Sequence, residues 1–288
     1  GSPGPAGSSE PAASVLAAPP AHASEIAGLV PGDTAVLYEF HGAGVTLQNA
    51  VSGLRSAPGV GGSLAPLDAT LGSLGGVAGL LGWIGDAGVA VMPDGAAATA
   101  GLVLLAPDAA TASAKVEQIR GLLGFAGLGG GFTLTTTSID GTTVTLVDLG
   151  DASKLLGSLG PVTSGAAGGL AIPPGTHVVL SIAAHGSTVL VGSGEAFARR
   201  MLETAAGSSL ADQASYQAAL ALAPAQNDGQ LFIAAAPTIA LAEGAIPAAD
   251  KARYETDIKP YLAPLGALLE TTTFDAGGLR IRLVLTAK

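Results

Sequence analysis

Histidines are the residues of this sequence best suited to acid–base chemistry or metal binding, and there are four: His22, His41, His177 and His185. No two of them have the i,i+2 or i,i+4 spacing that places two side chains on one face of a strand or a helix. We therefore expect neither a metal site nor a cofactor. Glu39 and His41 do share one face of a strand, where a carboxylate beside an imidazole can act as a general base. No nucleophile or oxyanion donor is close in sequence, so the pattern favours a solvated strand face.

Motifs for covalent catalysis and for nucleotide binding are missing. The sequence has no cysteine, which excludes disulfides, thiolate zinc sites and cysteine nucleophiles. It contains no G-x-S-x-G nucleophile turn, no H-E-x-x-H and no P-loop. The stretch VGSGEAF at 191–197 is similar to a dinucleotide-binding loop, but Phe197 occupies the third small position and the preceding strand belongs to a hairpin. We expect a protein that is not an enzyme, with no catalytic residues.

Charge narrows the range of partners. The net charge is −10 and the isoelectric point is about 4.6. The first lysine or arginine after the N-terminus is Arg55, so no basic arm is available for phosphates. We therefore exclude nucleic acid and anionic membrane surfaces as partners.

Residues 1–23 form a tract rich in proline, alanine, glycine and serine, a composition that buries too little apolar surface to fold alone. The tract lacks the basic and apolar regions of a signal peptide. We expect a flexible linker of the kind that follows a removed signal or an upstream membrane anchor. This predicts an extracytoplasmic protein, secreted or membrane-tethered. The alternative is an ordinary ragged terminus.

The uncharged run LGSLGGVAGLLGWIG at 71–85 contains the only tryptophan. Its apolar residues follow one helical stripe, and glycines occupy the remaining positions. The run is shorter than the roughly 20 residues that cross a bilayer, so we expect no membrane span within this chain. Core or subunit contact is the favoured interpretation, and the wall of a lipid-sized pocket is the alternative. The candidate contact residues are Leu74, Leu81, Trp83 and Ile84.

The positioning elements are mostly hairpins. Asp-Gly between alternating apolar and threonine positions predicts a hairpin from 132–139 and 142–149, because both turn residues need positive φ. Asp108 is a predicted N-cap of a helix that ends at Gly124. Neighbouring strands joined by tight turns indicate an α+β fold with antiparallel sheets and helices on one face. Further predicted elements are a strand at 34–40, hairpins from 87–92 and 100–106 and around His185-Gly186, helices at 194–207 and after Ser209, a solvated helix at 250–261, and a final strand with Arg280 and Arg282 exposed.

A repeated order of similar segments predicts that the chain consists of two related halves. TAVLYEF at 34–40 is followed by LAPL at 64–67 and a hairpin, and GQLFIAA at 229–235 is followed by LAPL at 262–265 and another hairpin. We expect a first α+β half at 24–165 and a second at 166–288, packed as one body.

The order of these elements resembles exported bacterial proteins grouped as domain of unknown function 3352. The resemblance rests on LVPGDTAVLYEF, GWIGDAGVAVMPDG, STVLVGSGEAFARRMLETAAGSSLADQASYQAAL and NDGQLFIAA, and covers nearly everything from residue 25 onward. The resemblance implies a soluble envelope domain and carries no catalytic residues.

We expect a non-enzymatic, extracytoplasmic protein that works in binding or assembly at the cell envelope, with an envelope protein as partner. Two alternatives stay open. One is a carrier of a lipid or another apolar ligand, and the other is a structural subunit that associates with itself.

Overall fold

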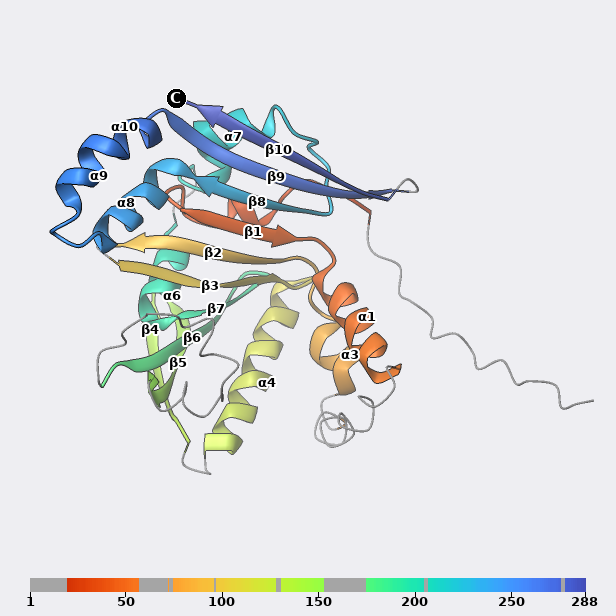
Figure 1. Ribbon diagram of the computed structural model, residues 1–288. Coiled ribbons are helices and arrows are strands. Elements are labelled where there is room, and N and C mark those ends of the chain that lie inside the picture. The colour runs from red at the N-terminus through yellow and green to blue at the C-terminus, as the bar shows by residue number, and fades with distance from the viewer. Residues whose placement is uncertain are drawn as a thin grey trace, which may run out of the picture.

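Antiparallel pairing joins the strands of the computed structural model into one sheet of ten strands (Figure 1). The structure describes residues 20–56, 72, 75–95, 97–127, 131–152, 175–204, 207–275 and 278–288. The strand order is β10-β9-β8-β1-β2-β3-β7-β6-β5-β4. The strands are β1 (Val36–Phe40), β2 (Ala87–Asp94), β3 (Ala97–Leu105), β4 (Thr133–Ile139), β5 (Thr142–Asp151), β6 (His177–His185), β7 (Thr188–Ser193), β8 (Gly229–Ala234), β9 (Leu265–Asp275) and β10 (Gly278–Ala287).

Tight turns form the hairpins where the sequence predicts them. Asp140 and Gly141 between β4 and β5 have φ values of 46° and 74°, as a two-residue turn with both positions left-handed requires. Gly95 between β2 and β3 and Gly186 between β6 and β7 also have positive φ. These three predicted hairpins are confirmed, and so is the fourth, since β9 pairs with β10.

Helices follow the predicted starts better than the predicted ends. The amide of Thr111 donates to Asp108 Oδ1 at 2.7 Å, which confirms Asp108 as the N-cap of α4, but the helix continues beyond Gly124 to Gly127. Ser209 and Asp212 form a capping box that opens a 3-10 turn rather than an α-helix. The helices are α1 (Ala43–Ser56), α3 (Gly76–Leu81), α4 (Ala109–Gly127), α6 (Gly194–Leu202), α7 (Ala214–Leu220), α8 (Ala235–Ala245), α9 (Lys251–Asp257) and α10 (Lys259–Leu262), with 3-10 turns η1 (Ile26–Gly28) and η3 (Leu210–Asp212).

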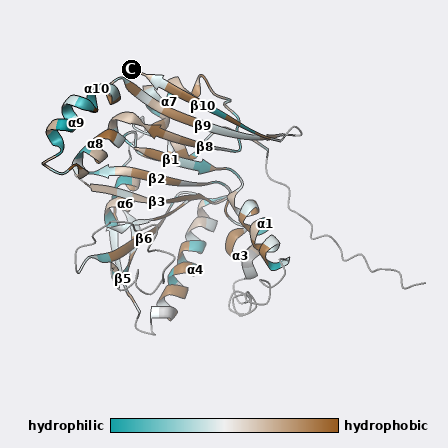
Figure 2. Ribbon diagram, viewed as in Figure 1, coloured by the Kyte–Doolittle hydropathy of each residue, from teal (hydrophilic) through white to brown (hydrophobic). Residues whose placement is uncertain are grey.

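Side chains alternate between two sides of the sheet. The inner side carries Leu37 and Phe232, which are fully buried beneath η1, η3, α6 and α7 in the main core. The outer side carries Tyr38 on β1 and its cross-strand partner Leu231 on β8. Figure 2 shows apolar residues concentrated on the strands, whereas α9 is hydrophilic.

The α+β class is confirmed, but the expectation of helices on one face is wrong. Helix α4 packs on the outer side, where its Ala112 and Val116 join Ile182 and Val189 in a second core cluster. The reason is that β6 and β7 are apolar on both sides, so each side needs its own cover.

The pair Gly101 and Gly192 makes room for the ring of Phe197 on the inner side. A Cβ on Gly192 would lie 2.0 Å from Phe197 Cδ1, and a Cβ on Gly101 would lie 2.6 Å from the same ring. Phe197 is fully buried there, which fixes α6 against β3 and β7.

The strand order runs identically outward from the pair β1 and β8. From β1 it reads β1-β2-β3, and from β8 it reads β8-β9-β10, with β1 and β8 paired to each other. Strands from the ranges 24–165 and 166–288 therefore alternate in blocks across one sheet. The first LAPL lies outside the described residues, and common descent of the two halves stays a prediction.

Candidate functional site

The outer side of β10 is apolar and exposed. Leu279, Ile281, Leu283 and Leu285 alternate along it and are 54% to 63% exposed. Phe274 on β9 pairs with Leu279 and is 67% exposed, and Tyr38 on β1 is 50% exposed. We call this set the open apolar surface: Tyr38, Phe274, Leu279, Ile281, Leu283 and Leu285.

Register places these side chains on one continuous side. Leu283 pairs with Glu270, Glu270 with Leu231, and Leu231 with Tyr38, so one row of neighbours crosses four strands. Arg280 and Arg282 point to the other side of β10 and are exposed, as predicted. The sequence pattern did not reveal that the apolar residues between them are exposed as well. The cause is that β10 is an edge strand with its apolar side turned outward.

A pocket of about 310 Å³ opens at one end of the open apolar surface. Its apolar wall includes Tyr38 and Phe274 of that surface, and its polar wall includes His41, Asp228 and Thr272. An apolar cavity with a few polar groups is the usual form of a small-molecule site. The remaining residues that line it are Phe40, Thr46, Gly229, Gln230, Leu231, Glu270 and Leu279.

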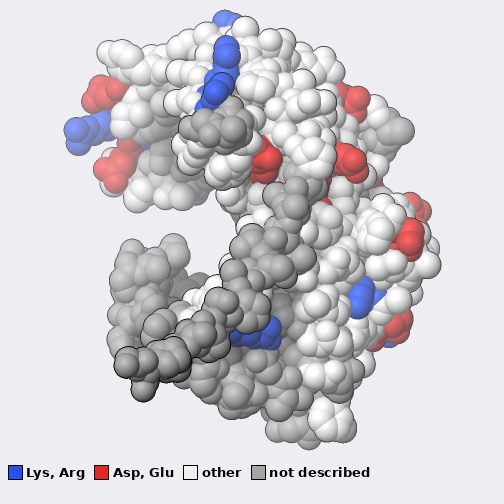
Figure 3. All heavy atoms as spheres, turned by 90° about the vertical axis from the view of Figure 1, so that its right-hand side faces the viewer, with Lys and Arg blue, Asp and Glu red and all other residues white. Residues whose placement is uncertain are grey.

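Figure 3 shows, above the hollow on its left side, described atoms that are white except for acidic and basic groups at the outer end. The carboxylates of the pocket itself belong to Asp228 and Glu270, and His41 is the one basic side chain among the described residues of its wall. Together with the net charge of −10, these carboxylates disfavour anionic ligands.

A buried polar cluster lies beside the pocket, centred on Glu39 of β1. Glu39 is fully buried, and its carboxylate accepts hydrogen bonds from the Ser24 hydroxyl, the Ile26 amide and Gln230 Nε2. Gln230 Nε2 also lies 2.9 Å from the Tyr216 hydroxyl. A buried carboxylate needs such donors, because each unmet acceptor costs free energy.

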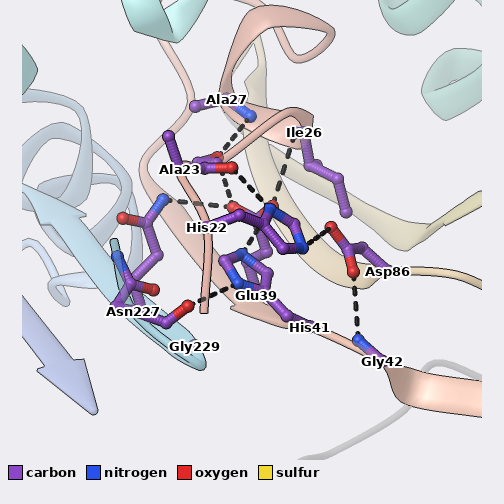
Figure 4. A network of polar contacts seen from close by, with 12 residues as sticks. His22, Ala23, Ile26, Ala27, Glu39, His41, Gly42, Asp86, Asn227 and Gly229 are labelled. Atoms are coloured by element: carbon purple, nitrogen blue, oxygen red, sulfur yellow. Dashed lines mark hydrogen bonds and ion pairs between the residues drawn. The ribbon is translucent and has the colours of Figure 1, made fainter. Parts of the chain in front are cut away.

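His41 and His22 stack in the same cluster (Figure 4), with ring centroids 3.9 Å apart and planes within 10°. His22 Nε2 lies 3.3 Å from Asp86 Oδ2, and His41 Nε2 lies 3.5 Å from Glu39 Oε1. The Gly42 amide donates to the other oxygen of Asp86 at 3.0 Å. The cluster joins residues far apart in the sequence, since His22 precedes the sheet, His41 follows β1 and Asp86 precedes β2.

The charge of His41 depends on its acidic neighbours. Burial alone would lower its pKa, but the contact with Glu39 and the negative charges of Asp86 and Glu39 outweigh burial and raise the pKa above its ordinary value. The expectation of a solvated strand face for Glu39 and His41 is wrong, because His41 is only 7% exposed and Glu39 is fully buried. The segment that contains His22 and η1 covers them.

The other two histidines lie elsewhere. His177 contacts Asp148 at 2.8 Å in an exposed pair on neighbouring strands, and hydrogen bonds from His177 and from the Gly150 amide lower the pKa of Asp148. His185 lies near Thr142 at the tip of a hairpin. Sequence spacing could not show that His22 and His41 meet, because an isolated bridge between His22 and Asn227 brings them together.

The residues predicted from the glycine-rich run lie against the start of α1, where the Gly44 amide donates to the Ile84 carbonyl. Leu74 is outside the described residues, and Leu81, Trp83 and Ile84 are partly buried. Trp83 Nε1 donates to the Leu80 carbonyl at 2.6 Å, and its ring packs against the second core cluster. Gly44 in α1 permits close approach here, since a Cβ on it would lie 2.4 Å from the Ile84 carbonyl. Ligand contact through this run stays a prediction.

Trp83 and Ile84 also line an open depression that reaches the polar cluster. Its volume is about 490 Å³, and His22 and Asp86 are part of its wall. The depression connects the cluster to solvent. It is separate from the open apolar surface, because the two share none of their residues.

Comparison with known proteins identifies the family. Residues 8–280 match the family described as "Protein of unknown function (DUF3352)". The chain belongs to this family. Neither a curated protein nor a solved structure matches it. Among the described residues, no helix of this family member is both long and apolar enough to span a membrane.

Proposed function

We propose that this protein is a non-enzymatic binding protein of the extracytoplasmic space, and that it holds an apolar ligand on the open apolar surface. The exposure of six large apolar side chains on one sheet side carries the proposal. Soluble proteins rarely leave such contiguous surface exposed unless a ligand or a partner covers it. The location outside the cytoplasm is supported by the composition of residues 1–23.

The shape and charge of the site define the class of ligand. The pocket of about 310 Å³ is at the lower end of the range for small-molecule sites, so it accommodates one end of a longer molecule. The open apolar surface then contacts the rest of the chain. Asp228 and Glu270 favour a head group that is neutral or positively charged. A single-chain amphiphile without negative charge fits both features.

Calorimetric titration of the full chain with monopalmitoyl glycerol, hexadecylamine and palmitate tests this proposal. We expect the neutral and cationic amphiphiles to bind and palmitate to bind at least about tenfold more weakly, because the carboxylates of the site repel it. Leu283→Gln should weaken binding of the neutral amphiphile by about tenfold, the effect of losing roughly 1.4 kcal/mol of apolar contact.

Leu222→Gln is the matched control, since Leu222 is 54% exposed and follows α7, on the inner side of the sheet. Its affinity should equal that of the unaltered protein. Equal affinity in both variants, or no binding of any amphiphile, would overturn the proposal. A stable dimer that Leu283→Gln converts to a monomer would instead show that the surface is an interface between copies.

A further inference from the structure

The hydrogen bonds of the two stacked histidines show which nitrogen of each ring carries the hydrogen. His22 Nδ1 lies 2.9 Å from the Ala23 carbonyl, and His41 Nδ1 lies 2.7 Å from the Asn227 carbonyl. A carbonyl oxygen only accepts hydrogen bonds, so Nδ1 carries the hydrogen on both rings. In each neutral ring, Nε2 is then the atom with the free lone pair.

Both Nε2 atoms face negative charge. That of His22 is 3.3 Å from Asp86 Oδ2, and that of His41 is 3.5 Å from Glu39 Oε1. Among the described residues, His41 Nε2 makes no hydrogen bond of normal geometry, although the histidine is 93% buried. A lone pair that faces a carboxylate is repelled, so a positive charge is needed between these atoms.

A single proton on His41 balances Glu39 but leaves the lone pair of His22 Nε2 facing Asp86. A proton on each Nε2 would create two imidazolium rings stacked at 3.9 Å, and these like charges repel each other. A single divalent cation shared by both Nε2 atoms and Asp86 supplies the same positive charge without that repulsion.

We propose that His22, His41 and Asp86 bind a divalent transition-metal ion of the zinc type. One ligand atom from each residue lies within 4.8 Å of the other two. Two imidazole nitrogens and one carboxylate oxygen are a donor set that suits Zn²⁺ and disfavours Mg²⁺ and Ca²⁺. The backbone carbonyls of Ala23 and Asn227 accept hydrogen bonds from Nδ1 of the two rings and leave each Nε2 for the ion, as the outer partners of metal-bound histidines do.

The ion has a path and requires one local adjustment. His22 and Asp86 line the open depression, so an ion can enter from solvent. Parallel rings cannot aim both lone pairs at one point, so coordination requires the His22 ring to tilt out of the stack. The His22 side chain is 35% exposed, whereas those of His41 and Asp86 are 2% and 8% exposed, so His22 is the ligand free to move.

The consequence is a clamp on the N-terminal segment. His22 precedes η1 and contacts the sheet through its backbone bridge to Asn227, whose two hydrogen bonds measure 3.1 and 3.2 Å. The metal ion adds a second link from the same residue to the ends of β1 and β2. This inference does not depend on the proposed ligand of the open apolar surface.

Calorimetric titration of the chelator-treated full chain with ZnCl₂ tests the site. We expect one Zn²⁺ per chain and no binding of Mg²⁺. His22→Ala should weaken Zn²⁺ binding by about 100-fold or more, since even outer-shell changes reduce metal affinity by up to about that factor. His22 is chosen because it lies outside the core, and circular dichroism checks that the variant is folded.

His177→Ala is the matched control, because it removes a histidine beside an aspartate at an exposed position. Its Zn²⁺ affinity should be unchanged. Absence of Zn²⁺ binding, or equal affinity in the unaltered protein and His22→Ala, would overturn the site.

Hydrogen exchange tests the clamp separately. Zn²⁺ should slow exchange of the His22 and Asn227 amides in the unaltered protein but not in His22→Ala. Binding without that protection would overturn the clamp and leave a metal site alone. Trp83 provides a second signal, since it lines the same depression and paramagnetic Co²⁺ at the site should quench its fluorescence.

Discussion

Tyr216 shows how far the buried cluster extends at the level of single residues. It lies on α7, is 3% exposed, and stacks edge to face on Phe232 with ring centroids 5.1 Å apart. Its hydroxyl meets Gln230, which in turn donates to Glu39. Burial raises the pKa of Tyr216 above its ordinary value, against the opposing effect of its hydrogen bonds to Gln230 and Ser24.

This raised pKa has a defined effect on stability. A group whose pKa is higher in the folded protein stabilises it fully below the unfolded pKa, here about 10, and loses this contribution as pH rises through the folded pKa. Above pH ~10 the unfolding free energy of Tyr216→Phe should therefore fall less steeply than that of the unaltered protein. At neutral pH the variant should lose about 0.5–1.5 kcal/mol of unfolding free energy with its hydrogen bond. Urea unfolding at several pH values measures both effects.

Tyr261→Phe serves as the control, because Tyr261 is 77% exposed. It should keep the pH dependence of the unaltered protein. If Tyr216→Phe keeps that dependence as well, another group is responsible for it.

Residue chemistry was only partly visible in the sequence. Glu39 and His41 are two positions apart, so their contact could be predicted, but their burial could not. That burial depends on the segment around η1, which is bridged to the distant residue Asn227, and on Gln230 of β8, which donates to Glu39. Neither partner has any sequence signal that links it to His41.

Elements were predicted well wherever local chemistry decides them. The turn at Asp140-Gly141 and the cap at Asp108 each depend on residues that are close together in the sequence, and both are confirmed. Helix ends were predicted less well, because Gly124 is compatible with a continuing helix while α4 packs against β6 and β7. In the glycine-rich run the structure describes a helix only at Gly76–Leu81 and a helical Gly72.

Asp108 gives a test at the level of the element. Its hydrogen bond from the Thr111 amide lowers its pKa, so its contribution to stability is present above the unfolded pKa near 4 and is lost as pH falls through the folded pKa. Asp108→Ala should lower the melting temperature at pH 7 by roughly 2–4 °C through loss of the cap. Differential scanning calorimetry at pH 7 and at pH 3 measures the change.

The difference in melting temperature between Asp108→Ala and the unaltered protein should be smaller at pH 3 than at pH 7. Asp108→Asn keeps a capping oxygen and should melt close to the unaltered protein at pH 7. Equal melting temperatures for the alanine variant and the unaltered protein would show that α4 does not depend on this cap.

One sheet runs through the whole molecule, and blocks of strands from the two halves alternate across it. Local patterns predicted its hairpins but not the pairing of β1 with β8 or of β3 with β7, because those strands are distant in sequence and their partners are chosen by packing. The exposure of the outer side of β10 was not predictable either, because it depends on which side of the sheet the helices cover. Alternation shows which residues share a side, whereas the covering helices decide which side is buried.

Alternation of the halves predicts one cooperative unfolding transition. In guanidinium chloride, Trp83 fluorescence and far-ultraviolet circular dichroism should give the same midpoint, because Trp83 packs against a core cluster that contains residues from both ranges. Leu37→Ala on the fully buried centre of β1 should lower both midpoints together, with a loss of about 2–5 kcal/mol. Separate midpoints would show that the halves unfold independently.

The bridge between His22 and Asn227 determines how the molecule carries mechanical load. Tension applied at Pro20 first reaches the sheet at this bridge, next to the interior strands β8 and β1. Tension applied through Lys288 reaches the edge strand β10, which can be peeled from β9 one hydrogen bond at a time. Pro20 and Lys288 are therefore mechanically unequal: a pull at Pro20 is distributed over interior strands of the sheet, and a pull at Lys288 separates its edge strand.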